Sequence, residues 1–109
     1  MHEVKIVTGQ RAVTAAGTAE KIKEAPEWQQ AHVIAIRIRA ATGNAGNIFI
    51  RNGEDVSACS TTGDIIAPGE VYVLDVSKWF DAYLDLSKIW IDAAVNGDSI
   101  SYTAFEVIR

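Results

Sequence analysis

Residues 31–51 read AHVIAIRIRAATGNAGNIFIR, two runs of alternating apolar residues separated by a turn rich in glycine and asparagine. Alternation with a period of two is typical of strands that bury one face and expose the other. The predicted inward positions are His32, Ile34, Ile36 and Ile38 in the first run, and Ile48 and Ile50 in the second. Glycine and asparagine tolerate positive φ, so the chain can reverse between the runs. We therefore predict a β-hairpin over this stretch.

Three arginines occupy the alternate positions of the same two runs. If the isoleucines pair across the hairpin, Arg37, Arg39 and Arg51 share the outer face, because residues opposite each other in an antiparallel pair lie on one side. Such a set is either an ordinary solvated face or a patch that meets acidic groups on a partner. We keep the three arginines as candidate partner contacts.

Alternating runs elsewhere in the chain extend this pattern. The predicted strands cover residues 4–8, 18–24, 63–66, 71–76, 88–95 and 99–108, the first of them at a sheet edge. Residues 11–17 are mostly small and are predicted to be a connector or an extended arm, and residues 54–64 a loop. About seven to eight short strands without a long helical period predict an all-β fold, an antiparallel β-sandwich of jelly-roll or immunoglobulin-like type.

Two turns and one bulge complete the predicted path of the chain. Residues 67–70, APGE, match a type II turn, with proline at the first central position and glycine at the second. The dipeptide Asn96-Gly97 is the one preferred in a type I′ hairpin turn. The inward set of the last run shifts from even-numbered to odd-numbered residues, which predicts a β-bulge near Thr103-Ala104.

Residues 77–86, SKWFDAYLDL, break the alternation. The aromatic side chains of Trp79, Phe80 and Tyr83 cluster as they would on one side of a helical turn, and Ser77 is a plausible N-cap. We predict a short helix or an aromatic-rich loop here. The three aromatic residues either anchor a protein interface or plug one end of the sandwich.

Length, composition and charge restrict the class of protein. The 109 residues suffice for a single domain over residues 1–109, in which residues 1–30 can include an extended arm. Apolar residues make up 49% and charged residues 22%, and no apolar run approaches the roughly 20 residues of a membrane-spanning helix. The net charge of −4 argues against nucleic acid as a partner. The N-terminus lacks a basic segment followed by an apolar one, so we expect synthesis in a cytoplasm without a secretory signal.

Residues that carry chemistry are sparse and scattered. Cys59 is the single cysteine, and His2 and His32 lie far apart without a metal-binding spacing. Asp81 and Asp85 are four residues apart, which suits either a metal or acid pair or, more simply, a solvated charged face. Neither a P-loop nor a nucleophile elbow is present in the sequence. We predict no enzymatic activity, no catalytic residue, no cofactor and no bound metal.

Three stretches, in this order, carry a resemblance to a known family: TGNAGNIFIRN at 42–52, IIAPGEVYVLDV at 65–76 and LSKIWIDAAVNGDSISYTAFEV at 86–107. The chain resembles small β-sandwich structural proteins of tailed bacteriophage virions, of the head decoration (cement), head-fibre or tail-associated type. The motifs of that family are structural, so no catalytic residue is carried over. Residues 77–85, SKWFDAYLD, replace a shorter polar link of the family pattern, and we expect the features special to this protein there.

The resemblance implies a virion protein made in the host cytoplasm. Its expected partners are the major capsid protein or other virion proteins, together with further copies of itself in a dimer or trimer. The most specific expectation is a capsid decoration protein that stabilises the head lattice. The alternative is a tail- or fibre-associated carbohydrate-binding module that contacts host glycans through Trp79, Tyr83 and Asp85.

The alternation in the first run makes a prediction about stability. Ile36→Ala should lower the free energy of unfolding by about 2 to 5 kcal/mol, because it leaves a cavity in the core. Arg37→Ala, one residue further on, should change it by less than about 0.5 kcal/mol, because its side chain lies on the solvated face. Urea unfolding of the two variants measures both values, and equal losses would show that the faces are misassigned.

Overall fold

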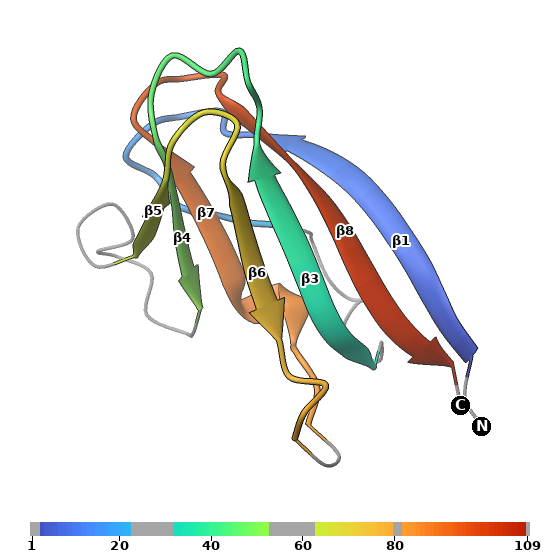
Figure 1. The fold of residues 1–109 in the computed structure, drawn as a ribbon. Helices are drawn as coiled ribbons and strands as arrows, with labels where there is room; N and C mark the ends of the chain where they lie inside the picture. The colour runs from blue at the N-terminus through green and yellow to red at the C-terminus, as the bar shows by residue number, and fades with distance from the viewer. Residues whose placement is uncertain (1–2, 23–31, 53–62, 80–81, 109) are drawn as a thin grey trace.

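The computed structural model describes residues 3–22, 32–52, 63–79 and 82–108 of the chain, which form two antiparallel four-stranded sheets packed face to face (Figure 1). The strands are β1 (Glu3–Ala12), β2 (Glu20–Lys21), β3 (Val33–Ala40), β4 (Ile48–Asn52), β5 (Asp64–Ile66), β6 (Val71–Asp75), β7 (Ile89–Ala93) and β8 (Ser99–Ile108), with a 3-10 helix, η1 (Leu86–Lys88). Sheet A has the order β1-β8-β3-β6 and sheet B the order β2-β7-β4-β5. The predicted all-β sandwich is confirmed.

The core between the sheets is built mainly from isoleucine. Inward-facing, almost fully buried isoleucines come from strands of both sheets, namely Ile36, Ile38, Ile48, Ile50, Ile89, Ile91 and Ile100. Each such side chain contributes about 1.5 to 3 kcal/mol through removal of its apolar surface from water. Branched side chains also suit the pleated strand, so one residue type serves both the strand and the core.

The predicted hairpin over residues 31–51 is wrong. Strand β3 belongs to sheet A and β4 to sheet B, and residues 41–47 carry the chain from one sheet to the other. Alternation and a glycine-rich turn fit both paths, but only the crossing lets the two isoleucine faces meet across the core. Asn96-Gly97 likewise lies in a turn between sheets and not in a hairpin, because β7 belongs to sheet B and β8 to sheet A.

The β3–β4 and β7–β8 connections, which both cross between the sheets, are bonded to each other at one end of the sandwich (Figure 1). The side-chain amide of Asn44 donates to the carbonyl oxygen of Ser99 at 2.8 Å, and its Oδ1 accepts the Ser99 N–H at 2.9 Å. Within the second loop Gly97 adopts a φ of 85°, a conformation that residues with a Cβ rarely take. These bonds favour the crossing over a local hairpin.

Two buried aspartates that the sequence analysis did not identify hold loops in place: Asp98 joins two loops, and Asp92 joins a loop to sheet B. The two carboxylate oxygens of Asp98 accept the N–H groups of Ala45 and Gly46 at 3.0 and 2.9 Å. Asp92 Oδ1 accepts the N–H of Gly17 at 2.9 Å, which holds residues 14–17 against sheet B. Hydrogen bonds to a carboxylate are stronger than those between neutral groups, so both contacts stabilise the positions of these loops.

The predicted bulge near Thr103-Ala104 is also wrong. Strand β8 pairs with β1 without a break from Glu3↔Ile108 to Ala12↔Ser99, and the irregularity lies on β3 between Val33 and Ala35. This irregularity reverses the facing of the first residues of the run, so Val33 is buried whereas His32 and Ile34 are only half-buried. The alternation on β8 continues through buried Ala104, and Phe105 and Val107 are half-buried on the outer side.

Of the two alternatives for residues 11–17, the structure shows a connector, because residues 13–19 join β1 to β2. Strand β1 lies at the edge of sheet A, as predicted, but continues through Ala12, and Val13 is buried in the core. The predicted strand over residues 18–24 is reduced to β2, and residues 23–31 and 53–62 lie outside the described residues. The type II turn before β6 is confirmed, because Gly69 has a φ of 83° and the Glu70 N–H donates to the Ala67 carbonyl oxygen at 2.9 Å.

Residues 77–79 and 82–85 form no helix, so the loop alternative for this stretch is the one observed. Ser77 is not an N-cap. Instead, its N–H donates to Asp75 Oδ1 at 2.8 Å. The hydroxyl and the N–H of Ser77 lower the pKa of Asp75 below its ordinary value, and the nearby charge of Lys78 lowers it further.

Gly9 in β1 allows a test of how closely this edge strand packs against Tyr102 of β8. Gly9 faces Tyr102 on β8, and a Cβ at this position would lie 2.8 Å from Tyr102 Cε1 and closer still to the hydroxyl. Gly9→Ala should therefore lower the free energy of unfolding by about 1 to 3 kcal/mol through overpacking. Gly43→Ala is the matched control, because a Cβ there has no neighbour within 4 Å. Equal unfolding curves for the two variants in urea would contradict the tight seating of Tyr102.

Candidate functional site

The three arginines predicted to share one face are divided between the two sheets. Arg37 and Arg39 are exposed on the outer side of β3 in sheet A, whereas Arg51 is half-buried on β4 in sheet B. The prediction of a single basic patch is wrong, because it depended on the hairpin that does not form. Arg37 lies between Thr103 and Val73 of the neighbouring strands, a polar and partly apolar setting.

The aromatic loop, described at residues 77–79 and 82–85, lies at the opposite end of the sandwich from the β3–β4 and β7–β8 connections (Figure 1). Trp79 is 62% exposed and Tyr83 is 58% exposed, so neither side chain plugs the core. Leu84 and Leu86, which are buried, close that end of the core instead. The plug hypothesis is therefore wrong for these two residues, and Phe80 lies outside the described residues.

Backbone hydrogen bonds connect this loop to the beginning of β3. The Val76 N–H donates to the Ile34 carbonyl oxygen at 2.9 Å, and the Leu84 N–H donates to the Val33 carbonyl oxygen at 2.6 Å. The ring of Tyr83 lies 5.2 Å from the ring of His32, with 37° between the ring planes. Trp79 and Tyr83 are thus presented to solvent by a loop whose two ends are bonded to β3.

The acidic pair and the other ligand-type residues do not assemble into a site within the described part of the chain. Asp81, Cys59 and His2 lie outside it, and Asp85 is half-buried. No group of three or more histidine, cysteine, aspartate or glutamate residues lies together among the residues that the structure describes. The absence of a metal or cofactor stays a prediction.

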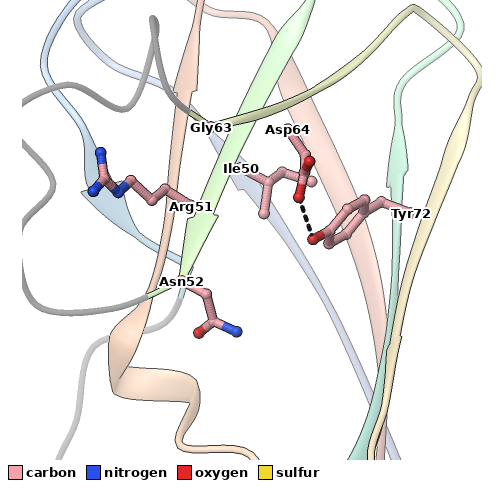
Figure 2. Close-up of a pocket in the computed structure, with 6 residues that line it drawn as sticks. All are labelled: Ile50, Arg51, Asn52, Gly63, Asp64 and Tyr72. Atoms are coloured by element: carbon pink, nitrogen blue, oxygen red, sulfur yellow. Dashed lines mark hydrogen bonds between the residues drawn. The ribbon is translucent and has the colours of Figure 1, made fainter.

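An open pocket of about 260 Å³ lies at one side of the sandwich, where the edge strands β5 and β6 approach each other (Figure 2). Its lining residues come from both sheets, and they are Ile50, Arg51, Asn52, Gly63, Asp64 and Tyr72. The Tyr72 hydroxyl donates to Asp64 Oδ2 at 2.6 Å, which joins sheet A to sheet B. Figure 2 shows Asp64 and Tyr72 facing each other, with Arg51 extending away on the other side of β4.

The environment of Tyr72 favours the protonated form of its hydroxyl. Burial, followed by the hydrogen bond to Asp64 and the charge of that carboxylate, raises the pKa of Tyr72 to about 12. The phenol therefore keeps its proton at neutral pH and acts as a donor that holds the two sheets together. Sequence reasoning missed the pair, because neither residue lies in a motif and the strands belong to different sheets.

The opposite side of the sandwich carries a second polar contact between the sheets. Arg11 on β1 binds Glu20 on β2 with a distance of 3.1 Å between Nη2 and Oε1. Glu20 also accepts the N–H of Thr14 at 2.7 Å through its other carboxylate oxygen. Both lateral openings of the sandwich are thus bridged by a polar pair, and both pairs have a structural role.

Comparisons with known proteins support the fold. No family model and no curated protein sequence matches the chain. Among solved structures the chain is similar to a protein of the Bacillus endospore appendages, described as a novel family of disulfide-linked pili. The two are 16% identical with a TM-score of 0.55, and the match covers 100% of this chain and 92% of the other. At this identity the likeness shows the fold alone. Within the described residues, no helix is long and apolar enough to span a membrane.

The raised pKa of Tyr72 makes the stability depend on pH in a defined range. Below pH 10 tyrosine is protonated in both states, whereas between pH 10 and about 12 the unfolded chain loses a proton that the native chain retains. The free energy of unfolding should therefore fall as the pH rises through this range, and more steeply in the wild type than in Tyr72→Phe. Urea unfolding at several pH values measures both slopes. Equal slopes would show that the Tyr72 proton is not held in the native state.

Proposed function

We propose that this chain is a non-enzymatic structural protein of a bacteriophage virion, a decoration protein that docks in many copies on the head lattice. The observation that carries the proposal is the pair of exposed aromatic residues, Trp79 and Tyr83, on a loop bonded to the sheet at both sides. Tryptophan and tyrosine are enriched among the residues that dominate protein interfaces. The bonds of Val76 and Leu84 to β3 restrict the two ends of this loop, which lowers the conformational freedom lost on binding and favours affinity.

The positions of the phage-like motifs support the same proposal. The Gly-Asn motif at 42–47 and the turn at 96–99 contact each other through Asn44, Asp98 and Ser99. These motif residues thus maintain the fold and are not free for chemistry. The segment that departs from the family pattern, residues 77–85, is the one that presents exposed aromatic side chains. The structurally similar Bacillus protein belongs to pili, so a sandwich of this kind serves there as a part of a protein assembly.

The proposed mechanism is mass action. A protein that binds the assembled lattice and not the free capsid subunit stabilises the lattice against dissociation. Neighbouring copies on a regular shell present several weak contacts at high effective concentration, so each single contact can be small. An aromatic loop at one end of the sandwich suits binding to a regular shell, because it leaves the sides of the sandwich accessible to neighbouring copies.

A carbohydrate-binding function at a tail or fibre is the second candidate. Exposed Trp79 and Tyr83 could stack on sugar rings beside Asp85, and the open pocket offers the polar side chains of Asn52 and Asp64. A glycan array probed with the purified protein separates the two candidates. Binding to defined glycans without binding to capsids favours the carbohydrate-binding function.

Co-sedimentation with capsids tests the decoration function. The purified protein is mixed with capsids that lack decoration, the particles are pelleted, and bound copies and the heat resistance of the particles are measured. Wild type should bind and raise heat resistance, and Trp79→Ala should bind at least tenfold more weakly, the loss of about 1.4 kcal/mol or more expected for a hot spot. Ile65→Ala is the control, because Ile65 is 58% exposed on a different part of the surface.

The outcomes of this experiment are separable. If wild type does not pellet with the capsids, the decoration function is wrong. If Trp79→Ala binds as well as wild type, the aromatic loop is not the anchor, although the decoration function survives. Circular dichroism of both variants should match wild type, because both side chains project into solvent.

A further inference from the structure

Exposed aliphatic side chains are concentrated on the two edge strands of sheet A. Eight large apolar side chains are exposed among the described residues, and four of them lie on these two strands. Val4 and Ile6 are on β1, and Val71 and Val73 are on β6. All four point to the outer face, because their cross-strand neighbours there are Val107, Phe105, Arg39 and Arg37.

Both edge strands also have an open side. In the described part of the chain β1 pairs with β8 alone and β6 pairs with β3 alone. Unpaired N–H and C=O groups along a strand edge are a template for another strand, and natural edges are usually protected by charges, proline or bulges. Strand β1 pairs over ten residues without a bulge, and it carries exposed Val4 and Ile6 in place of protecting charges on the outer face.

The directions of the two strands fit each other. Successive neighbours in the order β1-β8-β3-β6 are antiparallel, so β6 runs opposite to β1 (Figure 1). A second copy placed beside the first in the same orientation therefore brings its β6 antiparallel to β1. The sheet then continues from copy to copy with the same alternation and with all four aliphatic residues on one face.

Charge disfavours the pairing of two β6 edges. The segment 70–75 carries the acids Glu70 and Asp75 and no base, whereas on β1 Lys5 balances Glu3 and Arg11 is already paired with Glu20. Two β6 strands placed edge to edge would bring acid against acid. Two β1 strands would cover Val4 and Ile6 but leave Val71 and Val73 in water. Pairing of β1 with β6 covers both sets.

We propose that copies of this chain associate head to tail, with β6 of one copy adding to β1 of the next and extending sheet A. Such an interface is heterologous, so it closes into a ring or grows into a filament and does not stop at a dimer. The inference goes beyond the proposed function, because it concerns contacts between copies of the chain and not the contact with a capsid.

Two lysine substitutions and their mixture test the proposal. Ile6→Lys blocks the β1 edge, Val73→Lys blocks the β6 edge, and Ile65→Lys places the same charge on exposed β5 of sheet B as the control. Sedimentation velocity over a range of concentrations should show assemblies for wild type and Ile65→Lys and monomers for each blocked variant. An equal mixture of the two blocked variants should give a species of two chains, because one keeps a free β1 and the other a free β6.

Other outcomes would overturn the proposal. If Val73→Lys dimerises by itself and the mixture adds nothing, the interface is a symmetric pairing of two β1 strands. A wild-type chain that stays monomeric at all concentrations, or blocked variants that assemble like wild type, would exclude pairing through these edges. Circular dichroism confirms that each variant is folded, and Val4→Lys with Val71→Lys provides a second pair if one is not. The assay contains no capsid and leaves Trp79 unchanged, so this proposal and the decoration function can fail independently.

Discussion

The contact between the inner faces of the two sheets is the constraint on which the rest of this structure depends. Isoleucines from β3 and β8 in sheet A meet isoleucines from β4 and β7 in sheet B, and most of the apolar surface that the fold buries lies in this layer. Because the sheets must face each other, every connection except that between β4 and β5 carries the chain from one sheet to the other. Several of these connections have polar partners: Asn44 and Asp98 join residues 41–47 to residues 98–99, and Asp92 binds Gly17 between β1 and β2.

A two-layer sandwich has two open sides between its sheets. In this protein polar pairs bridge these sides, whereas the edge strands of sheet A expose aliphatic side chains to solvent. Toward the core, the openings are bridged by the polar pairs Tyr72–Asp64 and Arg11–Glu20. Toward solvent, the edge strands of sheet A carry valine and isoleucine. The pairs supply hydrogen-bond partners to the half-buried side chains of Tyr72, Arg11 and Glu20. The aliphatic residues remain about half exposed in the isolated chain, which is why they suggest a neighbour.

The proposed contact surfaces are compatible with one another in space. The aromatic loop lies at one end of the strands, whereas the edges of sheet A run along the sides (Figure 1). A chain that joins its neighbours through the edges therefore still presents Trp79 and Tyr83 at the same end of the continued sheet from every copy. Repeated presentation of one weak contact is the arrangement in which multivalency is most effective on a regular lattice. No catalytic chemistry is needed for either contact.

The sequence by itself determined the fold class, because a side-chain period of two and regularly spaced turns are local properties of the chain. It also determined that Ile36 and Ile50 are buried, that Arg37 is exposed, and that a type II turn precedes β6. Only the tertiary structure decided which strands pair. A turn such as Asn96-Gly97 reverses the chain equally well within one sheet or between two, and the choice is made by the burial of both isoleucine faces together with long-range bonds such as those of Asp98. For the same reason the grouping of the arginines, the Tyr72–Asp64 contact and the place of β6 at the second edge of sheet A could not be predicted, since each depends on residues that are distant in the chain and meet only once the two sheets have packed.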